Sequence, residues 1–243
     1  MPFKIRVLLS LLCLMLAAAG CSKDIKVEGD DPDSSAAHLF ESGNDAMREQ
    51  NYVLSVKYFN RLKEDYPFSP YTVEAELSLA DSYYLDDEWL LAAEAYKEFE
   101  TMHPRHEAMP YVLYQIAMSD MNTYISVDRP PTLVVEAYSY FRRLVETFPT
   151  HEYVSKAEFQ MYKCRRIMAE YEVYTGDFMY RTKNYMAAWR RYMIVIEQYK
   201  DFPDLVEYSE KRRYIAYFLH MRNGNEQTRR VREGTWHNLF NWL

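Results

Sequence analysis

The sequence predicts an all-α solenoid of about five helical hairpins, and three observations indicate this fold class. A phrase of small, aromatic and proline residues recurs at fixed offsets along the chain. Only six of the 243 residues are glycine, and no segment shows the alternation of apolar and polar residues that a strand requires. The composition is 49% hydrophobic and 16% aromatic, which is enough to bury an extended helical core.

Each copy of the phrase ends in a proline. An aromatic residue stands eight positions before the proline, a small residue four positions earlier, and a large residue three positions earlier again. In chain order these are Pro67, Phe59, Ser55 and Tyr52, then Pro104, Tyr96, Ala92 and Trp89, then Pro149, Phe141, Ala137 and Val134. This is the spacing of a tetratricopeptide repeat, a pair of antiparallel helices that stacks on its neighbours.

A second small residue, nine positions before the large one, is predicted to lie where the two helices of a hairpin cross. Gly43, Ala80 and Gly176 occupy this position. In the third copy Ala117 precedes Val134 by seventeen residues, which predicts a longer loop around residues 126–131. In the fourth copy Pro203 follows the aromatic Tyr192 by eleven residues instead of eight, and we expect an insertion there.

Apolar residues at helical spacing also fill residues 153–168, which predicts one extra helix in the last interval between prolines. The solenoid is therefore expected over residues 36–222, as one continuous stack. Helices are predicted near residues 37–49, 52–65, 71–86, 89–102, 109–124, 132–147, 153–182, 185–200 and 204–222.

The start of the chain reads as an export signal. Residues 1–20 combine a short basic head with an apolar run of 13 residues that is too short to span a bilayer. The run ends in small residues directly before Cys21, like the lipobox of bacterial lipoproteins, in which this cysteine carries the lipid. The alternative is an ordinary cleavage site followed by an incidental cysteine. Residues 21–35 are rich in Asp, Ser, Gly and Pro and are expected to form a flexible tether.

Residues 223–243 form a tail for which two interpretations stay open. Gly224 and Gly234 interrupt the helical pattern, while Trp236, Leu239 and Phe240 crowd the end of the chain. The tail is either a capping segment folded over the last helix or an exposed aromatic hook for a partner.

The charge is uneven. The chain holds 29 Lys and Arg against 36 Asp and Glu; residues 21–110 carry 8 against 20, and residues 111–243 carry 19 against 16. An acidic front and a mildly basic rear suggest two surfaces with different partners, although repeat proteins also solvate their outer faces with charge of either sign. The negative total and the export signal disfavour nucleic acid as a partner.

No arrangement of residues typical of an enzyme is present, so no catalytic residue and no cofactor is expected. His103 and His106 stand three apart on the turn that ends a repeat, where Pro104 prevents a regular helical ligand face, and no metal site is predicted there. Cys164, within a helical pattern, is expected to be a buried and inert thiol.

The architecture does predict a concave binding surface. Positions one and four residues after the small residue of each first helix share a face. These positions are Asn44 and Met47, Asp81 and Tyr84, Met118 and Met121, and Asp177 and Tyr180. Aromatic and methionine side chains beside isolated polar groups suit an extended apolar peptide, although several of them could simply pack between hairpins.

With the lipobox, the tether and the phrase Tyr66-Pro67-Phe68-Ser69-Pro70-Tyr71, the chain resembles the BamD family from Cys21 to about Pro203. These are tetratricopeptide lipoproteins of the machinery that inserts β-barrels into the outer membrane. The resemblance implies a non-enzymatic adaptor whose front repeats receive targeting segments of unfolded outer-membrane proteins and whose rear repeats hold a BamA-like barrel protein. Other assembly lipoproteins are further expected partners.

The resemblance also assigns residues and a location. The family's arginine for BamA contact falls on Arg191, and Arg190 lies beside it. Ser22 after the lipidated cysteine implies sorting to the outer membrane, with the chain facing the periplasm. The competing hypothesis is an envelope lipoprotein that binds peptidoglycan, assists a cell-wall hydrolase or is one itself.

Overall fold

The computed structural model describes residues 35–240, with side chains described as far as residue 224. The secondary structure of this part of the chain is entirely helical. Its helices are α2 (Ala36–Arg48), α3 (Tyr52–Asp65), α4 (Thr72–Leu85), α5 (Trp89–Met102), α6 (Met109–Asn122), α7 (Thr132–Thr147), α8 (Tyr153–Arg181), α9 (Tyr185–Gln198) and α10 (Pro203–Phe240). The predicted all-α repeat solenoid is confirmed, as four hairpins followed by one long helix.

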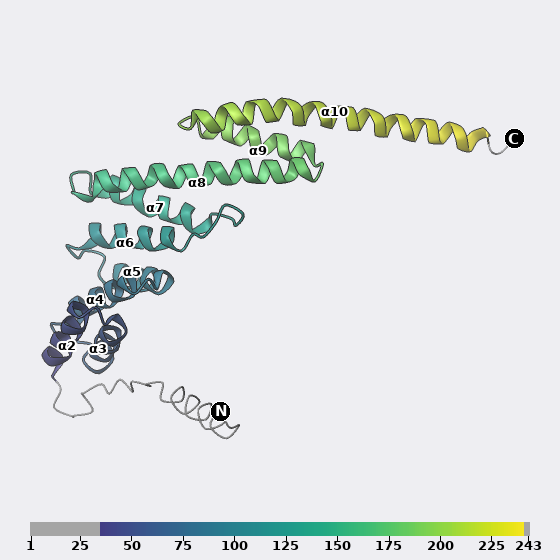
Figure 1. Cartoon of the computed structure of the whole chain (residues 1–243). Helices are drawn as coiled ribbons and strands as arrows, with labels where there is room; N and C mark the ends of the chain where they lie inside the picture. Colours follow the sequence, from purple (N-terminus) through teal and green to yellow (C-terminus); the bar gives the residue numbers. More distant parts are fainter. Residues whose placement is uncertain (1–34, 241–243) are drawn as a thin grey trace, which may run out of the picture.

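The helices stack in chain order. In Figure 1 they climb from α2 and α3 at one end to α10 at the other, and each helix packs against the one before and the one after it. Additional contacts join α2 to α4, α6 to α8 and α8 to α10. The first helices of the hairpins therefore form one layer, and the second helices form the other.

Small residues set the distance between the two helices of a hairpin. A Cβ atom added at Gly43 would lie 2.5 Å from the ring of Phe59, and one at Gly176 would lie 2.8 Å from the ring of Tyr192. In the second and third hairpins Ala80 shares a core cluster with Tyr96, and Ala117 shares one with Phe141. All four aromatic residues are fully buried, so the predicted crossing positions are confirmed.

The turns between paired helices repeat as well. Gln50, Asp87 and Lys183 stand two residues before the second helix and adopt positive φ of 59°, 59° and 64°. In each turn the next backbone N–H donates to a carbonyl five residues back, as from Asn51 to Ala46 at 2.8 Å. The third hairpin instead has residues 123–131 between its helices, which is the longer loop that the spacing predicts.

Two expectations about the rear of the solenoid were wrong. Helix α9 ends six residues after Tyr192, as α3, α5 and α7 end six residues after their aromatic residues, so nothing is inserted in the fourth copy. Pro203 is instead the first residue of α10, where proline is favoured because the first N–H of a helix has no partner within the helix.

The last helix was expected to end near residue 222, and it continues to Phe240. Glycine lowers helix stability by about 1 kcal/mol relative to alanine but does not stop a helix as proline does. Residues 204–240 contain no proline. In Figure 1 α10 extends well past the end of α9 and does not fold back over it, which argues against a capping segment over this range.

Candidate functional site

The residues predicted to line the concave surface come from the first helices α2, α4, α6 and α8. All eight are half-buried in the structure. Several contact their own neighbours closely. Met47 packs against the core cluster of the first hairpin, and Met118 and Met121 pack against that of the third.

Asp81 on α4 connects two hairpins. Its carboxylate accepts hydrogen bonds from the hydroxyl groups of Tyr96 on α5 and Tyr111 on α6, the latter at 2.6 Å. Burial raises the pKa of Asp81, and the two tyrosine hydrogen bonds partly offset this. Burial also raises the pKa of both tyrosines, and the adjacent carboxylate raises them further. The predicted groove residue is therefore also a link between helices.

Asp177 on α8 makes the same link in the fourth repeat. Tyr192 on α9 donates to it at 2.6 Å and Tyr208 on α10 at 2.8 Å, while Arg212 donates to it at 3.2 and 3.3 Å. The guanidinium of Arg212 also lies over the ring of Tyr180, 4.5 Å from its centroid. Sequence reasoning missed these links.

A signal for the links is nevertheless present in the sequence. Aspartate follows the small residue only in the copies whose buried aromatic is tyrosine, and in both copies the two lie fifteen residues apart: Asp81 with Tyr96, Asp177 with Tyr192. In the copies that carry Phe59 and Phe141 the corresponding residues are Asn44 and Met118. A buried hydroxyl needs an acceptor and a phenyl ring does not, so the two positions vary together.

Tyr84 lies at the edge of the same surface. Its ring packs edge-on against Trp89 with centroids 4.9 Å apart, and Asn122 donates to its hydroxyl at 3.4 Å. Burial raises the pKa of Tyr84. Tyr84 thus offers a ring face held in place by Trp89.

The motif of residues 66–71 forms the turn between α3 and α4. The carbonyl of Tyr66 accepts from the Thr72 hydroxyl at 2.7 Å and from the Ser69 N–H at 3.0 Å, which fixes the turn. The ring of Tyr71 stacks on Phe40 with centroids 5.5 Å apart. Phe68 is 99% exposed, so this motif combines a rigid turn with a fully accessible phenyl ring.

Arg190 and Arg191 have different environments on α9. Arg190 is exposed, whereas Arg191 donates to both carboxylate oxygens of Glu172 on α8, at 2.9 and 3.1 Å. The Glu172 side chain is only 15% exposed. Arg191 therefore holds α9 against α8, and its remaining exposed edge is what a partner could reach.

A polar cluster joins α5, α6 and α7. Lys97 lies 3.3 Å from the buried Asp120 carboxylate and 2.7 Å from that of Glu136. Burial raises the pKa of Asp120 to about 6, although the Lys97 charge opposes this rise. A perturbed carboxyl group is a common feature of catalytic sites. Here, however, the Asp120 side chain is 2% exposed, so a glycan chain could not reach it.

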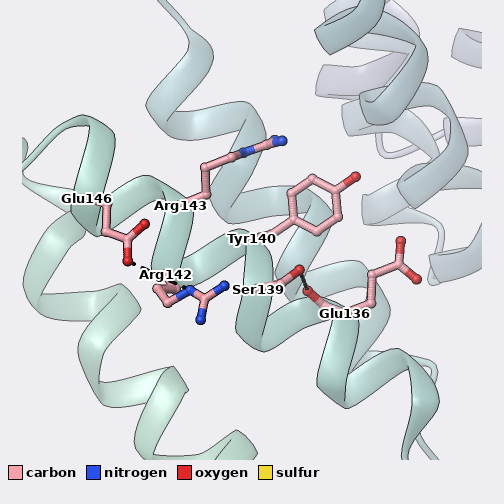
Figure 2. A pocket seen from close by; sticks show the side chains of 6 residues that line it. All are labelled: Glu136, Ser139, Tyr140, Arg142, Arg143 and Glu146. Carbon is pink, nitrogen blue, oxygen red and sulfur yellow. Dashed lines mark hydrogen bonds and ion pairs between the residues drawn. The ribbon is translucent and has the colours of Figure 1, made fainter.

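Two hollows lie next to this cluster, and Glu136 lines the first of them. The first has a volume of about 460 Å³, and Glu136, Ser139, Tyr140, Arg142, Arg143 and Glu146 line it, all from α7 (Figure 2). The second, of about 400 Å³, shares Arg143 and is also lined by Met109, Leu113 and Phe148. Neither hollow contains a predicted groove residue, and their arginines pair with Glu146 and Glu100.

The remaining expectations concern metal, membrane and thiol chemistry. Within residues 35–224 no three His, Cys, Asp or Glu side chains gather as metal ligands would. None of the described helices has both the length and the apolar character needed to cross a bilayer. Cys164 is buried, and burial raises the pKa of its thiol to about 12, as expected for an inert thiol. Residues 1–34, with the signal, Cys21 and almost all of the tether, lie outside the described part of the chain.

The fold and these surfaces define a class of protein: a helical repeat scaffold that offers faces and turns for contact with other polypeptides. The sequence model of one family, YfiO, described as an outer membrane lipoprotein, matches residues 32–230. The chain therefore belongs to this family of outer membrane lipoproteins, to which the BamD proteins correspond.

Relatives with assigned names support the same family. The chain is 29% identical to the outer membrane protein assembly factor BamD of Vibrio cholerae, and the alignment covers 83% of this chain and 85% of the relative. It is 28% identical to BamD of Neisseria meningitidis, over 90% and 87% of the two chains. It is 26% identical to BamD of Xylella fastidiosa, over 82% and 71%.

Proposed function

We propose that this chain is a non-enzymatic scaffold of the machinery that assembles β-barrel proteins into the outer membrane. The observation that carries the proposal is the alignment with proteins named outer membrane protein assembly factor BamD, which spans most of both chains. The two-layer solenoid supports it, because stacked hairpins offer extended surfaces to other polypeptides.

The front repeats receive targeting segments of unfolded outer-membrane proteins. The residues proposed for this groove are Asn44, Met47, Asp81, Tyr84, Met118 and Met121. Their half-buried positions suit a shallow peptide groove, because each leaves part of its side chain accessible. The turn between the first and second hairpins, from α3 to α4, carries the motif residues Tyr66, Pro67, Phe68, Pro70 and Tyr71. Phe68 is exposed there and accessible to a partner.

Tyr84 gives the sharpest test of this groove. We expect Tyr84→Ala to weaken binding of a fluorescent peptide, copied from the terminal strand of an outer-membrane protein, by about tenfold, the usual scale of a lost aromatic contact. Tyr84→Phe should bind almost normally because it keeps the ring against Trp89. Leu90→Ala, which truncates a more exposed apolar residue on α5, is the matched control. Equal affinity for all four proteins would contradict the groove.

The rear repeats bind a BamA-like barrel protein through Arg190 and the accessible edge of Arg191. Arg191→Glu is a poor probe, because it would place two carboxylates face to face at Glu172. Arg190→Glu is cleaner, since Arg190 is exposed. In affinity purification from detergent-solubilised membranes, we expect it to reduce recovery of the barrel protein several-fold. Lys200→Glu, an equal charge change at an exposed position, should leave recovery unchanged.

Lipid on Cys21 anchors the protein to the outer membrane, with the solenoid facing the periplasm. Labelling with a radioactive fatty acid should mark the wild type and not Cys21→Ser. If purification of the wild type recovers no barrel protein, the assembly role is contradicted. If the purified solenoid releases fragments from peptidoglycan, the non-enzymatic role is contradicted and the hydrolase hypothesis is favoured.

A further inference from the structure

Helix α10 presents an apolar face that is largely open; among the described residues only Tyr217 lies near a ring of another helix, that of Trp189. Tyr214, Phe218 and Met221 are 67%, 65% and 47% exposed, and Ile215 and Tyr217 flank them at 46% and 47%. We call these five residues the α10 apolar face. Positions 214, 218 and 221 recur at helical spacing, so they form one stripe along the helix. A continuous stripe of this kind is typical of a docking surface.

Within residues 35–240 no further hairpin helix lies over this face. Tyr111 on α6 and Tyr208 on α10 are equivalent, because each donates to the aspartate of the preceding first helix. Six residues after Tyr111 is the buried Ala117, where α7 crosses; six residues after Tyr208 is Tyr214, large and exposed. Another hairpin helix could not approach as closely there.

An unpaired cation lies at the edge of the α10 apolar face. Every other partly buried arginine described in α8 to α10 has a carboxylate partner: Arg165, Arg166, Arg191 and Arg212. Arg213 has none among the described residues. Its guanidinium donates to Met193 Sδ and to the Tyr214 hydroxyl, at 3.3 and 3.1 Å, and its Nε is buried without a hydrogen bond. The buried Nε is not accessible to a partner, but Arg213 as a whole is only half-buried, so a partner's carboxylate could pair with the exposed part of the guanidinium.

The charges of this segment indicate the chemistry of the partner. Residues 211–222 contain four Lys or Arg and no Asp or Glu. Lys211 pairs with Glu207 and Arg212 with Asp177, whereas Arg213 and Arg222 have no carboxylate partner among the described residues. We propose that the α10 apolar face binds an acidic amphipathic helix of a partner protein, whose apolar side chains cover Tyr214, Phe218 and Met221 and whose carboxylate pairs with Arg213. The inference goes beyond the proposed function, because it uses neither the concave groove nor Arg191.

Two other occupants fit less well. A second copy of the chain would bring two basic segments together, which like charges disfavour. An anionic membrane surface is held by several free cations, whereas Lys211 and Arg212 are already paired with Glu207 and Asp177. Arg213 is also held against the Tyr214 ring, 4.6 Å from its centroid, a fixed geometry that suits pairing with a carboxylate.

The test uses the full-length chain in its native membranes, with the photo-reactive amino acid p-benzoylphenylalanine at position 221. We expect a cross-link to one partner peptide in which apolar residues at helical spacing are flanked by Asp or Glu. Phe218→Ser and Arg213→Glu should each lower its yield at least tenfold. Leu90→Ser, at a comparably exposed apolar residue, should not lower it. Replacing the partner's acidic residue by arginine should restore the yield with Arg213→Glu.

Other outcomes would overturn the inference. These are a cross-link to lipid, a cross-link to a second copy of this chain, a partner peptide without acidic residues, or no cross-link at all. Recovery of the barrel protein, measured in the same membranes, keeps the two proposals apart. If that recovery persists while the expected cross-link is absent, the α10 inference fails and the assembly role stands.

Discussion

The spacing of each hairpin depends on one small and one aromatic side chain that meet where its helices cross. Gly43 meets Phe59 and Gly176 meets Tyr192 at distances that leave no room for a Cβ atom. Gly224, by contrast, is exposed in α10 and has nothing within 4 Å of a Cβ position. The same residue type is therefore required by packing in two places and only tolerated in the third.

We predict that Gly43→Ala destabilises the protein by about 1–3 kcal/mol, because an added methyl group overpacks a buried crossing. Gly224→Ala should instead raise helicity near the end of α10 by up to about 1 kcal/mol, the difference in helix propensity. Urea unfolding measures the first effect, and hydrogen exchange of residues 220–230 measures the second. If Gly43→Ala were stabilising, the crossing would be looser than described.

The raised pKa of Asp120 makes the stability of the folded protein depend on pH, and it also fixes the sign of this dependence. The folded protein holds this proton up to about pH 6, whereas an unfolded aspartate releases it near its ordinary value of 3.8. Between these values the folded state binds more protons, so stability falls as pH rises. At about 1.4 kcal/mol per pKa unit, the loss amounts to at most about 3 kcal/mol.

We therefore predict that the stability difference between wild type and Asp120→Asn changes by up to about 3 kcal/mol between pH 4 and pH 7, to the disadvantage of the wild type. Urea unfolding at a series of pH values measures it. The exposed substitution Asp86→Asn serves as the control. A stability difference that stays constant with pH would mean that the pKa of Asp120 is not raised in the folded protein.

At the scale of elements, the sequence predicts the bounds of most helices correctly. Apolar periodicity placed every helix end within about two residues of its observed position, apart from the end of α10. The spacing of prolines was less informative, because Pro203 opens a helix while Pro67 and Pro104 lie in turns. Proline tolerates both positions, so its spacing alone does not mark the end of a repeat.

The turn residue Asp87 allows a prediction at this scale. Its φ of 59° is one that glycine adopts readily and that strains other residues. We expect Asp87→Gly to stabilise the protein by about 0.5–1 kcal/mol. The neighbouring Asp86 has φ of −87°, so Asp86→Gly should not stabilise it. Thermal unfolding of the two variants distinguishes them, and equal effects would contradict the argument.

At the scale of the whole molecule, the stability of each hairpin depends mainly on its contacts with the adjacent helices. Helix α10 covers Ala188 and Tyr192 of α9 through Ala216, and it supplies Tyr208 and Arg212 to Asp177. Among the residues that the structure describes, nothing comparable joins α10 to the front repeats, which lie at the other end of the stack in Figure 1. Removal of one end of the solenoid should therefore destabilise mainly the adjoining hairpin.

We predict that a chain ending at Phe202 loses amide protection in α9 and in the second half of α8, while α2 to α5 keep theirs. Hydrogen exchange with mass spectrometry resolves these segments. A uniform loss of protection would show a single cooperative unit instead of nearest-neighbour coupling.

The sequence by itself determined the fold class, the crossing positions and the helix ends except that of α10. Helical periodicity and small-residue spacing are local properties, so they can be recognised without the tertiary structure. It also singled out residues 66–71 and Arg191 through a family resemblance. Only the tertiary structure decided which polar groups are already engaged. Asp81 meets Tyr111 thirty residues away, Arg191 meets Glu172 on the neighbouring helix, and Arg213 meets no carboxylate among the described residues. Such pairings depend on which faces adjacent helices turn toward each other, and that is fixed by the packing of the stack.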